Sequence, residues 1–175
     1  GTIRVSRNVS PDVAARKIQE LENNPPIEQS GNLIRVGHIK DSELRRHVSI
    51  SYELIVPADT RVKSETGSGD QSVAGLKGPV KATTGSGNIH LANLSNEARA
   101  NTGSGDIELT SVSGMVYAST GSGNVRAAGI SASIRASTGS GDVRLEQSAK
   151  DPVDVETGSG NVEVRGVAPC RDGQR

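Results

Sequence analysis

The sequence predicts an all-β fold, namely a single-chain β-solenoid of about six 18-residue coils with a small N-terminal α+β cap. Three observations carry this prediction: a motif that recurs at a fixed period, apolar residues that recur with it, and a near absence of aromatic residues. The motif Thr-Gly-Ser-Gly occurs six times, at spacings of 18, 18, 18, 18 and 19 residues. It begins at Thr66, Thr84, Thr102, Thr120, Thr138 and Thr157.

Apolar residues between the motifs form five columns when the repeats are aligned. In their order along the repeat, the columns are Ile89, Ile107, Val125, Val143 and Val162; Val73, Leu91, Leu109, Ala127, Leu145 and Val164; Leu76, Leu94, Val112, Ile130 and Val167; Val80, Ala98, Val116, Ile134 and Val153; and Ala82, Ala100, Ala118, Ala136 and Val155. The first two columns lie two residues apart, as do the last two, which is the periodicity of a strand with one apolar face. Each repeat therefore contains two short strands joined by two corners.

The missing aromatic residues indicate a thin core. The chain has no Trp or Phe, and its only tyrosines are Tyr52 and Tyr117. A two-strand repeat cannot bury its own apolar face, but stacked repeats can, because each column then packs on itself. Coils about 4.8 Å apart would enclose a narrow interior that small aliphatic side chains fill.

The residue after each motif alternates between Asp and Asn. These residues are Asp70, Asn88, Asp106, Asn124, Asp142 and Asn161. Carboxylates stacked one coil apart would repel each other, whereas alternation separates them by about 9.6 Å, close to the Debye length at physiological salt. Asn side chains between them can stack as a hydrogen-bonded ladder, so we interpret all six residues as a structural ladder. The extra residue of the fifth repeat, around positions 147–152, predicts a bulge at a corner.

The regions before and after the repeats are expected to form a cap at one end of the solenoid and a short tail at the other. Residues 1–47 predict an N-terminal cap with one helix and short strands, residues 48–167 the solenoid repeats, and residues 168–175 a tail. Ser10-Pro11-Asp12 is typical of a helix start, and segments 2–6 and 32–39 are expected to be strands. Alternation over residues 48–56 predicts a long strand that leads into the first coil. Because the tail covers little of the other end, we expect the chain to continue or to associate end to end there.

One stretch of the chain carries a family resemblance. The segment Tyr52-Glu-Leu-Ile-Val-Pro-Ala-Asp-Thr-Arg-Val-Lys-Ser-Glu-Thr-Gly-Ser-Gly-Asp70, followed by Gly-Pro-Val-Lys-Ala-Thr-Thr-Gly-Ser-Gly-Asn, resembles the bacterial adhesin family of β-strand-repeat envelope proteins. The resemblance covers about residues 48–167. It implies a β-solenoid that is exported to the bacterial cell envelope or the extracellular space, and it brings no catalytic residues.

Charge points to one candidate binding surface. Twenty basic residues balance twenty acidic ones, so no global field attracts nucleic acid, and no apolar run is long enough to span a membrane. One outward row beside the alanine column is nevertheless mostly basic: Lys63, Lys81, Arg99, Tyr117 and Arg135, followed by Asp154. Like charges stacked along a ladder are unfavourable, so this row is a candidate site for an anionic envelope polymer, with another protein as a further candidate partner. The alternative is a solvated face that Glu65 and Glu156 partly neutralise.

A calcium-stabilised β-roll is the first alternative class. Such rolls also use 18-residue coils, but here the Gly-rich corner occurs once per coil and half of the coils carry Asn. Carboxylates about 9.6 Å apart cannot share a cation whose ligands lie at about 2.3–2.6 Å. A melting temperature insensitive to EDTA and Ca²⁺ would exclude this class.

A polysaccharide-cleaving β-helix enzyme is the second alternative. An enzyme needs converging groups, yet His38, His47 and His90 share no motif and the outward acids are scattered. We therefore expect no catalytic residues, no metal and no cofactor, and we favour a non-catalytic, envelope-associated binding or scaffold module. A threonine ladder is also typical of ice-binding solenoids, although each coil here offers a single Thr followed by Gly.

Overall fold

The structure, a computed structural model, describes residues 2–5, 19, 23, 27–31, 33–36 and 48–166. The chain divides into two compact units, Gly1–Ile55 and Val56–Arg175. The described part of the first unit includes two small antiparallel strand pairs: β1 (Thr2–Val5) with β4 (Val48–Ser51), and β2 (Ile27–Ser30) with β3 (Leu33–Val36). Most of the helix that we expected from Ser10 onward lies outside the described residues, but Gln19 and Asn23 are described and are helical.

The long strand expected over residues 48–56 is wrong in its second half, because β4 ends at Ser51. β4 pairs with β1 along its whole length, from Val48 opposite Val5 to Ser51 opposite Thr2. The ladder therefore stops where its four-residue partner stops. The following residues belong to no strand until β5, and Ile55 is 97% exposed.

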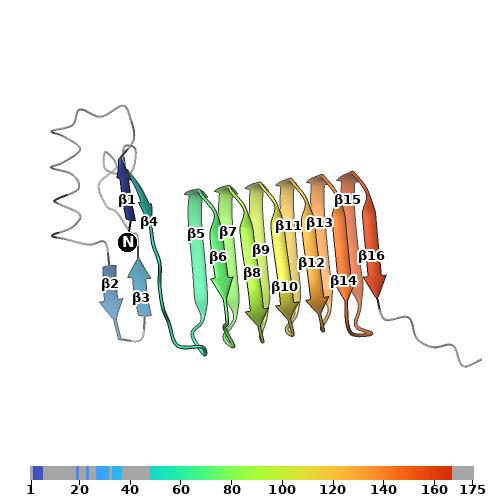
Figure 1. The fold of residues 1–175 in the computed structure, drawn as a ribbon, viewed down its shortest axis with the longest axis horizontal. Helices are drawn as coiled ribbons and strands as arrows, with labels where there is room; N and C mark the ends of the chain where they lie inside the picture. The colour runs from blue at the N-terminus through green and yellow to red at the C-terminus, as the bar shows by residue number, and fades with distance from the viewer. Residues whose placement is uncertain are drawn as a thin grey trace, which may run out of the picture. The chain divides into compact units, whose positions relative to one another are not determined.

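The second unit is a β-solenoid of six coils, as the sequence predicted, built from two parallel six-stranded sheets (Figure 1). The odd-strand sheet contains β5 (Val62–Ser68), β7 (Val80–Ser86), β9 (Ala98–Ser104), β11 (Val116–Ser122), β13 (Ile134–Ser140) and β15 (Val153–Ser159). The even-strand sheet contains β6 (Gln71–Ala74), β8 (Ile89–Leu94), β10 (Ile107–Val112), β12 (Val125–Ile130), β14 (Val143–Gln147) and β16 (Val162–Gly166).

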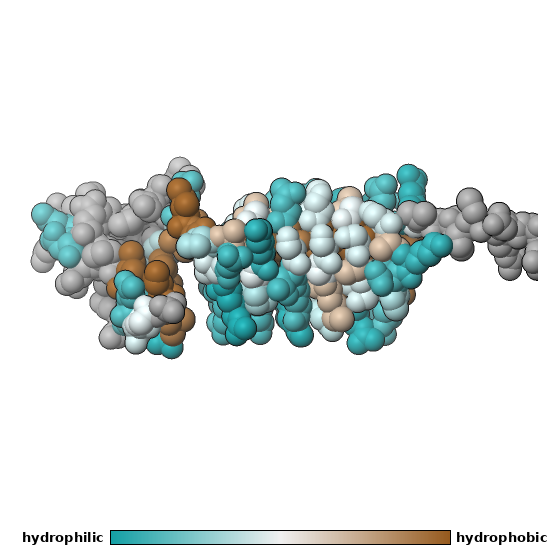
Figure 2. All heavy atoms as spheres, turned by 90° about the horizontal axis from the view of Figure 1, so that it is seen from below, coloured by the Kyte–Doolittle hydropathy of each residue, from teal (hydrophilic) through white to brown (hydrophobic). Residues whose placement is uncertain are grey.

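The predicted apolar columns form the core. Strand pairing places residues one repeat apart side by side, for example Ile107 between Ile89 and Val125. Twenty hydrophobic side chains of these columns are at most 4% exposed, so the core runs without interruption through the middle coils. The side of the solenoid seen in Figure 2 is mainly hydrophilic. Val167, which we assigned to the third column, lies outside the described residues.

A sixth inward column, absent from our sequence prediction, consists of the motif threonines. Thr84, Thr102, Thr120 and Thr138 are only 2–4% exposed. Each hydroxyl donates to the carbonyl of the last motif glycine one coil earlier, as Thr102 Oγ1 does to Gly87 O at 3.0 Å. Each threonine thus fills space in the core and also donates a hydrogen bond to a glycine carbonyl at the corner of the neighbouring coil. The ice-binding alternative is wrong, because a buried threonine column cannot face water.

The nineteen-residue spacing arises from two local changes in the fifth coil. In earlier coils the residue before the third column has positive φ, as at Asn93 (53°) and Ser111 (56°). The fifth coil lacks this residue, so Gln147 turns inward opposite Ile130 and is 6% exposed. The following corner, residues 148–152, has five residues instead of three, and Gln147 Nε2 donates to its Asp151 carbonyl at 3.0 Å. The fifth coil thus has one residue fewer before the corner and two more within it, which together give the one extra residue in the spacing.

Candidate functional site

The structure places the five candidate ligand residues in one row on the outer face of the odd-strand sheet. Pairing of β5, β7, β9, β11, β13 and β15 aligns Lys63, Lys81, Arg99, Tyr117, Arg135 and Asp154 side by side. We call the first five of these residues the basic row. The side chains of Lys63 and Arg135 are 62% and 68% exposed, so ligands in solution can reach them.

Acidic neighbours partly neutralise both ends of the basic row. Lys63 Nζ lies 2.9 Å from Glu65 Oε1, and the hydrogen bond from Lys63 lowers the pKa of Glu65. Arg135 Nη2 lies 2.6 Å from Asp154 Oδ2. Exposed pairs of this kind contribute little to stability, because water and salt screen them.

The centre of the basic row holds a stacked cation. Arg99 forms an ion pair with Glu97, and its guanidinium carbon lies 4.4 Å from the centre of the Tyr117 ring. This cation–π contact holds the guanidinium against the ring. Lys81 has no ion pair among the described residues, although its charge helps to lower the pKa of Glu65.

A second outward row on the same sheet carries small hydrogen-bonding side chains. Between Glu65 and Glu156 this row consists of Thr83, Asn101, Ser119 and Ser137. Ser137 Oγ donates to Ser119 Oγ at 3.0 Å. The basic row and this polar row together form a flat track that repeats once per coil, which we call the polar track.

The six ladder residues are joined by hydrogen bonds from backbone to side chain. In each of the first five, a side-chain oxygen accepts the N–H of the equivalent residue one coil later, for example Asp106 Oδ1 from Asn124 N at 2.7 Å and Asn124 Oδ1 from Asp142 N at 2.9 Å. Asp and Asn serve equally as acceptors in these bonds. Asn also donates to the Asp below it, as Asn124 Nδ2 does to Asp106 Oδ1 at 3.2 Å. A second Asp at that position could not donate, which gives the alternation a reason beyond the spacing of charges.

The ladder predicts an acid-sensitive step at Asp142. The N–H of Asn161 donates to its carboxylate at 2.9 Å and holds the pKa of Asp142 below its ordinary value of 3.8. The stability that the ionised form contributes is therefore present above that value and is lost as the pH falls through the lowered pKa. We expect Asp142→Asn, which keeps the acceptor oxygen but removes the charge, to lower stability slightly at pH 7 and to lose less of it below pH 4. Urea unfolding from pH 7 to pH 2 tests this, and an unchanged acid profile would contradict it.

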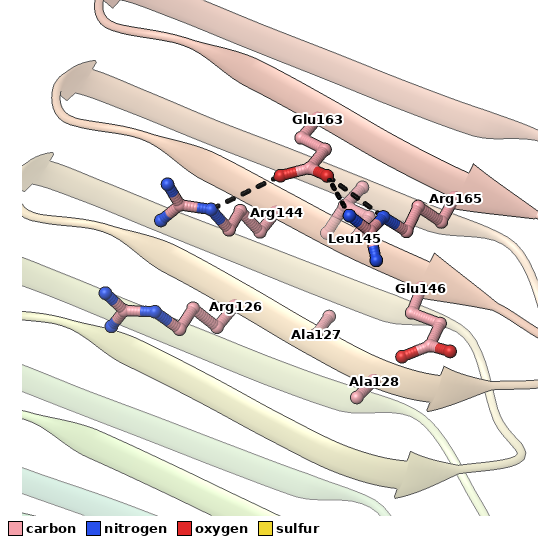
Figure 3. Close-up of a pocket in the computed structure, with 8 residues that line it drawn as sticks. All are labelled: Arg126, Ala127, Ala128, Arg144, Leu145, Glu146, Glu163 and Arg165. Atoms are coloured by element: carbon pink, nitrogen blue, oxygen red, sulfur yellow. Dashed lines mark hydrogen bonds and ion pairs between the residues drawn. The ribbon is translucent and has the colours of Figure 1, made fainter.

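The even-strand sheet carries charges of both signs around a hollow of about 350 Å³ (Figure 3). Arg144 Nε and Arg165 Nη2 both approach Glu163, at 3.4 and 2.7 Å. Arg126 Nη1 lies 3.5 Å from Asp106 Oδ2. Arginines and acids on this face thus pair with one another.

Metal chemistry has no candidate ligand set in the described part of the chain, where no three His, Cys, Asp or Glu side chains gather to hold an ion. His90 Nδ1 instead lies 3.2 Å from Glu108 Oε2, while His38 and His47 lie outside the described residues. In residues 48–166 and the shorter described segments, no helix is long and apolar enough to cross a membrane.

Stacked coils, a continuous side-chain ladder and flat outer faces define a β-solenoid repeat protein. A family model described as Toastrack DUF4097 matches residues 50–171, more than two thirds of the chain. The chain belongs to the Toastrack DUF4097 family. No curated protein and no solved structure matches the chain. The family description names a fold and no activity, so it agrees with the repeat architecture and leaves adhesion and envelope location as proposals.

Proposed function

We propose that this chain is a non-catalytic binding module of the bacterial cell envelope that holds an anionic polymer along its odd-strand sheet. The observation that carries the proposal is the polar track, in which a cationic or aromatic side chain stands beside a hydroxyl or amide in each of the middle coils. Because coils are spaced by about 4.8 Å, a polymer extended along the axis would meet similar groups at each step. The adhesin resemblance supports the envelope location.

The ion pairs of the basic row are compatible with ligand binding. Glu65 and Asp154 form ion pairs with the cations at the two ends of the basic row, but the side chains of both acids are exposed. An exposed ion pair contributes little to stability, so a ligand carboxylate or phosphate can replace the protein acid at little cost. Binding of this kind gains strength from repetition along the track rather than from one deep pocket, and it weakens with salt.

The absence of catalysis is part of the proposal. General acid and base catalysis needs two groups that converge on one reacting atom. On the described faces, the acids next to cations are already in ion pairs, such as Glu163 between Arg144 and Arg165 (Figure 3). The basic row offers cations and a tyrosine but no facing pair of carboxylates, which supports binding over cleavage.

Binding of the chain to purified anionic polymers of bacterial envelopes tests the proposal. Isothermal titration would compare the unaltered chain with Arg99→Ser/Arg135→Ser at about 50 and about 300 mM salt. Arg126→Ser/Arg144→Ser is the matched control, because it removes two arginines with acidic partners from the other sheet. We expect affinity to fall roughly tenfold in the first variant, equivalent to about 1.4 kcal/mol, and to stay unchanged in the control. Equal affinities in the two variants, or no binding by the unaltered chain, would overturn the proposal.

A further inference from the structure

We propose that the chain associates end to end with further copies of itself, so that the last coil of one copy stacks on the first coil of the next. The contact would join β15 and β16 of one copy to β5 and β6 of another, so it requires the N-terminal unit, which we expected to cap this end, to leave the edge of β5 and β6 accessible. This inference is separate from polymer binding, because the contact joins the ends of two solenoids and is tested without polymer.

The last coil presents an unfinished core. Within the described residues the two sheets end at β15 and β16 on one side and at β5 and β6 on the other. Val162 and Val164 belong to inward columns but are 47% and 46% exposed, whereas Val125 and Leu109 in the same columns are fully buried. An open strand edge with exposed apolar side chains is a ready template for another strand.

The ladder residues at the two ends are complementary. In every coil after the first, the ladder N–H donates to the side-chain oxygen of the coil before, as Asn161 N does to Asp142 Oδ1 at 2.9 Å. The side-chain oxygen of Asn161 is the acceptor that a following coil would use, and the N–H of Asp70 is the donor that a preceding coil would meet. Stacking Asp70 of the next copy on Asn161 therefore adds one ladder bond and continues the alternation of Asn and Asp.

Charges on the outer face select head-to-tail stacking. The outward row begins with Lys63 and ends with Asp154, so these opposite charges of two copies would lie about one coil spacing, 4.8 Å, apart. Joining two last coils would instead bring Asp154, Glu156 and Glu163 against the same acids of the other copy. In the head-to-tail arrangement Glu156 approaches Glu65, but the Lys63 ammonium 2.9 Å away already neutralises Glu65.

Two apolar columns also continue across the proposed contact. Val153 would follow the column that begins at Val62, and Val164 would meet Val73. Two other columns do not continue as apolar: Val162 would meet Gln71, whose Oε1 is buried without a hydrogen-bond partner, and Val155 would meet Ser64. A head-to-tail contact has different surfaces on its two sides, so assembly would extend beyond a dimer.

A charge-swap experiment tests the contact. Sedimentation equilibrium of the full chain over a concentration series, without added polymer, should show an average mass that rises past that of a dimer. Asp154→Lys and Lys63→Asp should each remain monomeric at concentrations where the unaltered chain assembles. A one-to-one mixture of the two variants should assemble again, because the introduced lysine of one copy then meets the introduced aspartate of the other.

The mixture distinguishes a lost contact between copies from structural damage within each variant. Asp154→Lys also breaks the ion pair with Arg135, and Lys63→Asp the pair with Glu65, but mixing two damaged chains cannot repair either defect. Glu108→Lys, a charge reversal on the middle strand β10, is the control and should assemble like the unaltered chain. A monomer at every concentration, assembly that stops at a dimer, single variants that still assemble, or a mixture that stays monomeric would each overturn the proposal.

Discussion

Gly105→Ala should unfold the solenoid or lower its free energy of unfolding by at least about 4 kcal/mol, an exceptional loss for one methyl group. A Cβ at Gly105 would lie 2.0 Å from the Gly87 carbonyl oxygen in the coil beneath. The coils cannot separate to make room, because backbone bonds such as Gly87 N to Ser104 O, at 2.9 Å, hold them on both sides. The backbone φ of 145° at Gly105 adds strain for any residue with a side chain. Urea unfolding followed by far-ultraviolet circular dichroism measures the loss.

The first coil supplies a matched control. Gly69 occupies the same motif position with nearly the same φ, 148°, but the nearest atom to an added Cβ is Thr66 Oγ1 at 3.8 Å. Gly69→Ala should therefore show only the backbone strain, about 1–3 kcal/mol. The difference between the two variants isolates the steric contact between coils. Equal losses would mean that the backbone conformation, and not the close approach of coils, requires glycine.

The coil number and the five columns could be predicted from the sequence because both follow from period alone. An 18-residue repeat fixes which residues stack, and a two-residue alternation fixes which of them face inward. This is why Lys63 through Arg135 could be aligned before any side chain was placed. The same alternation, extended by one step from Ala100 to Thr102, could have revealed the buried threonine column, because the hydroxyl of an inward threonine can donate to a backbone carbonyl such as Gly87 O.

Features that depend on side-chain reach could not be predicted in this way. The partners of the basic row come from different places: Glu65 from the same strand, Glu97 from a corner, and Asp154 from the next coil. Spacing in the sequence does not tell which of these acids a flexible Lys or Arg contacts. Gln147 is a similar case, since its inward turn depends on the positive-φ residue that the fifth coil lacks.

Leu109→Ala should lower the free energy of unfolding by about 3 kcal/mol, in the middle of the range for a buried leucine. Leu109 is fully buried in the third coil, between Leu91 and Ala127 of the same column. The loss combines the removed apolar surface with a cavity, and the alanine columns opposite are too small to fill it. Backbone pairing of β10 with β8 and β12, in the two neighbouring coils, prevents the strand from moving inward to fill the cavity. Urea unfolding at low protein concentration, where copies do not associate, measures the effect.

Val164→Ala in the same column is the control, because Val164 lies in the last coil and is 46% exposed. We expect it to lose less than about 1 kcal/mol, since the removed methyl groups are half in water and leave no closed cavity. At concentrations where copies stack, the loss for Val164→Ala should rise, because the next coil would bury this side chain. If Val164→Ala matched Leu109→Ala even in dilute solution, the last coil would already be covered and its edge could not receive a second copy.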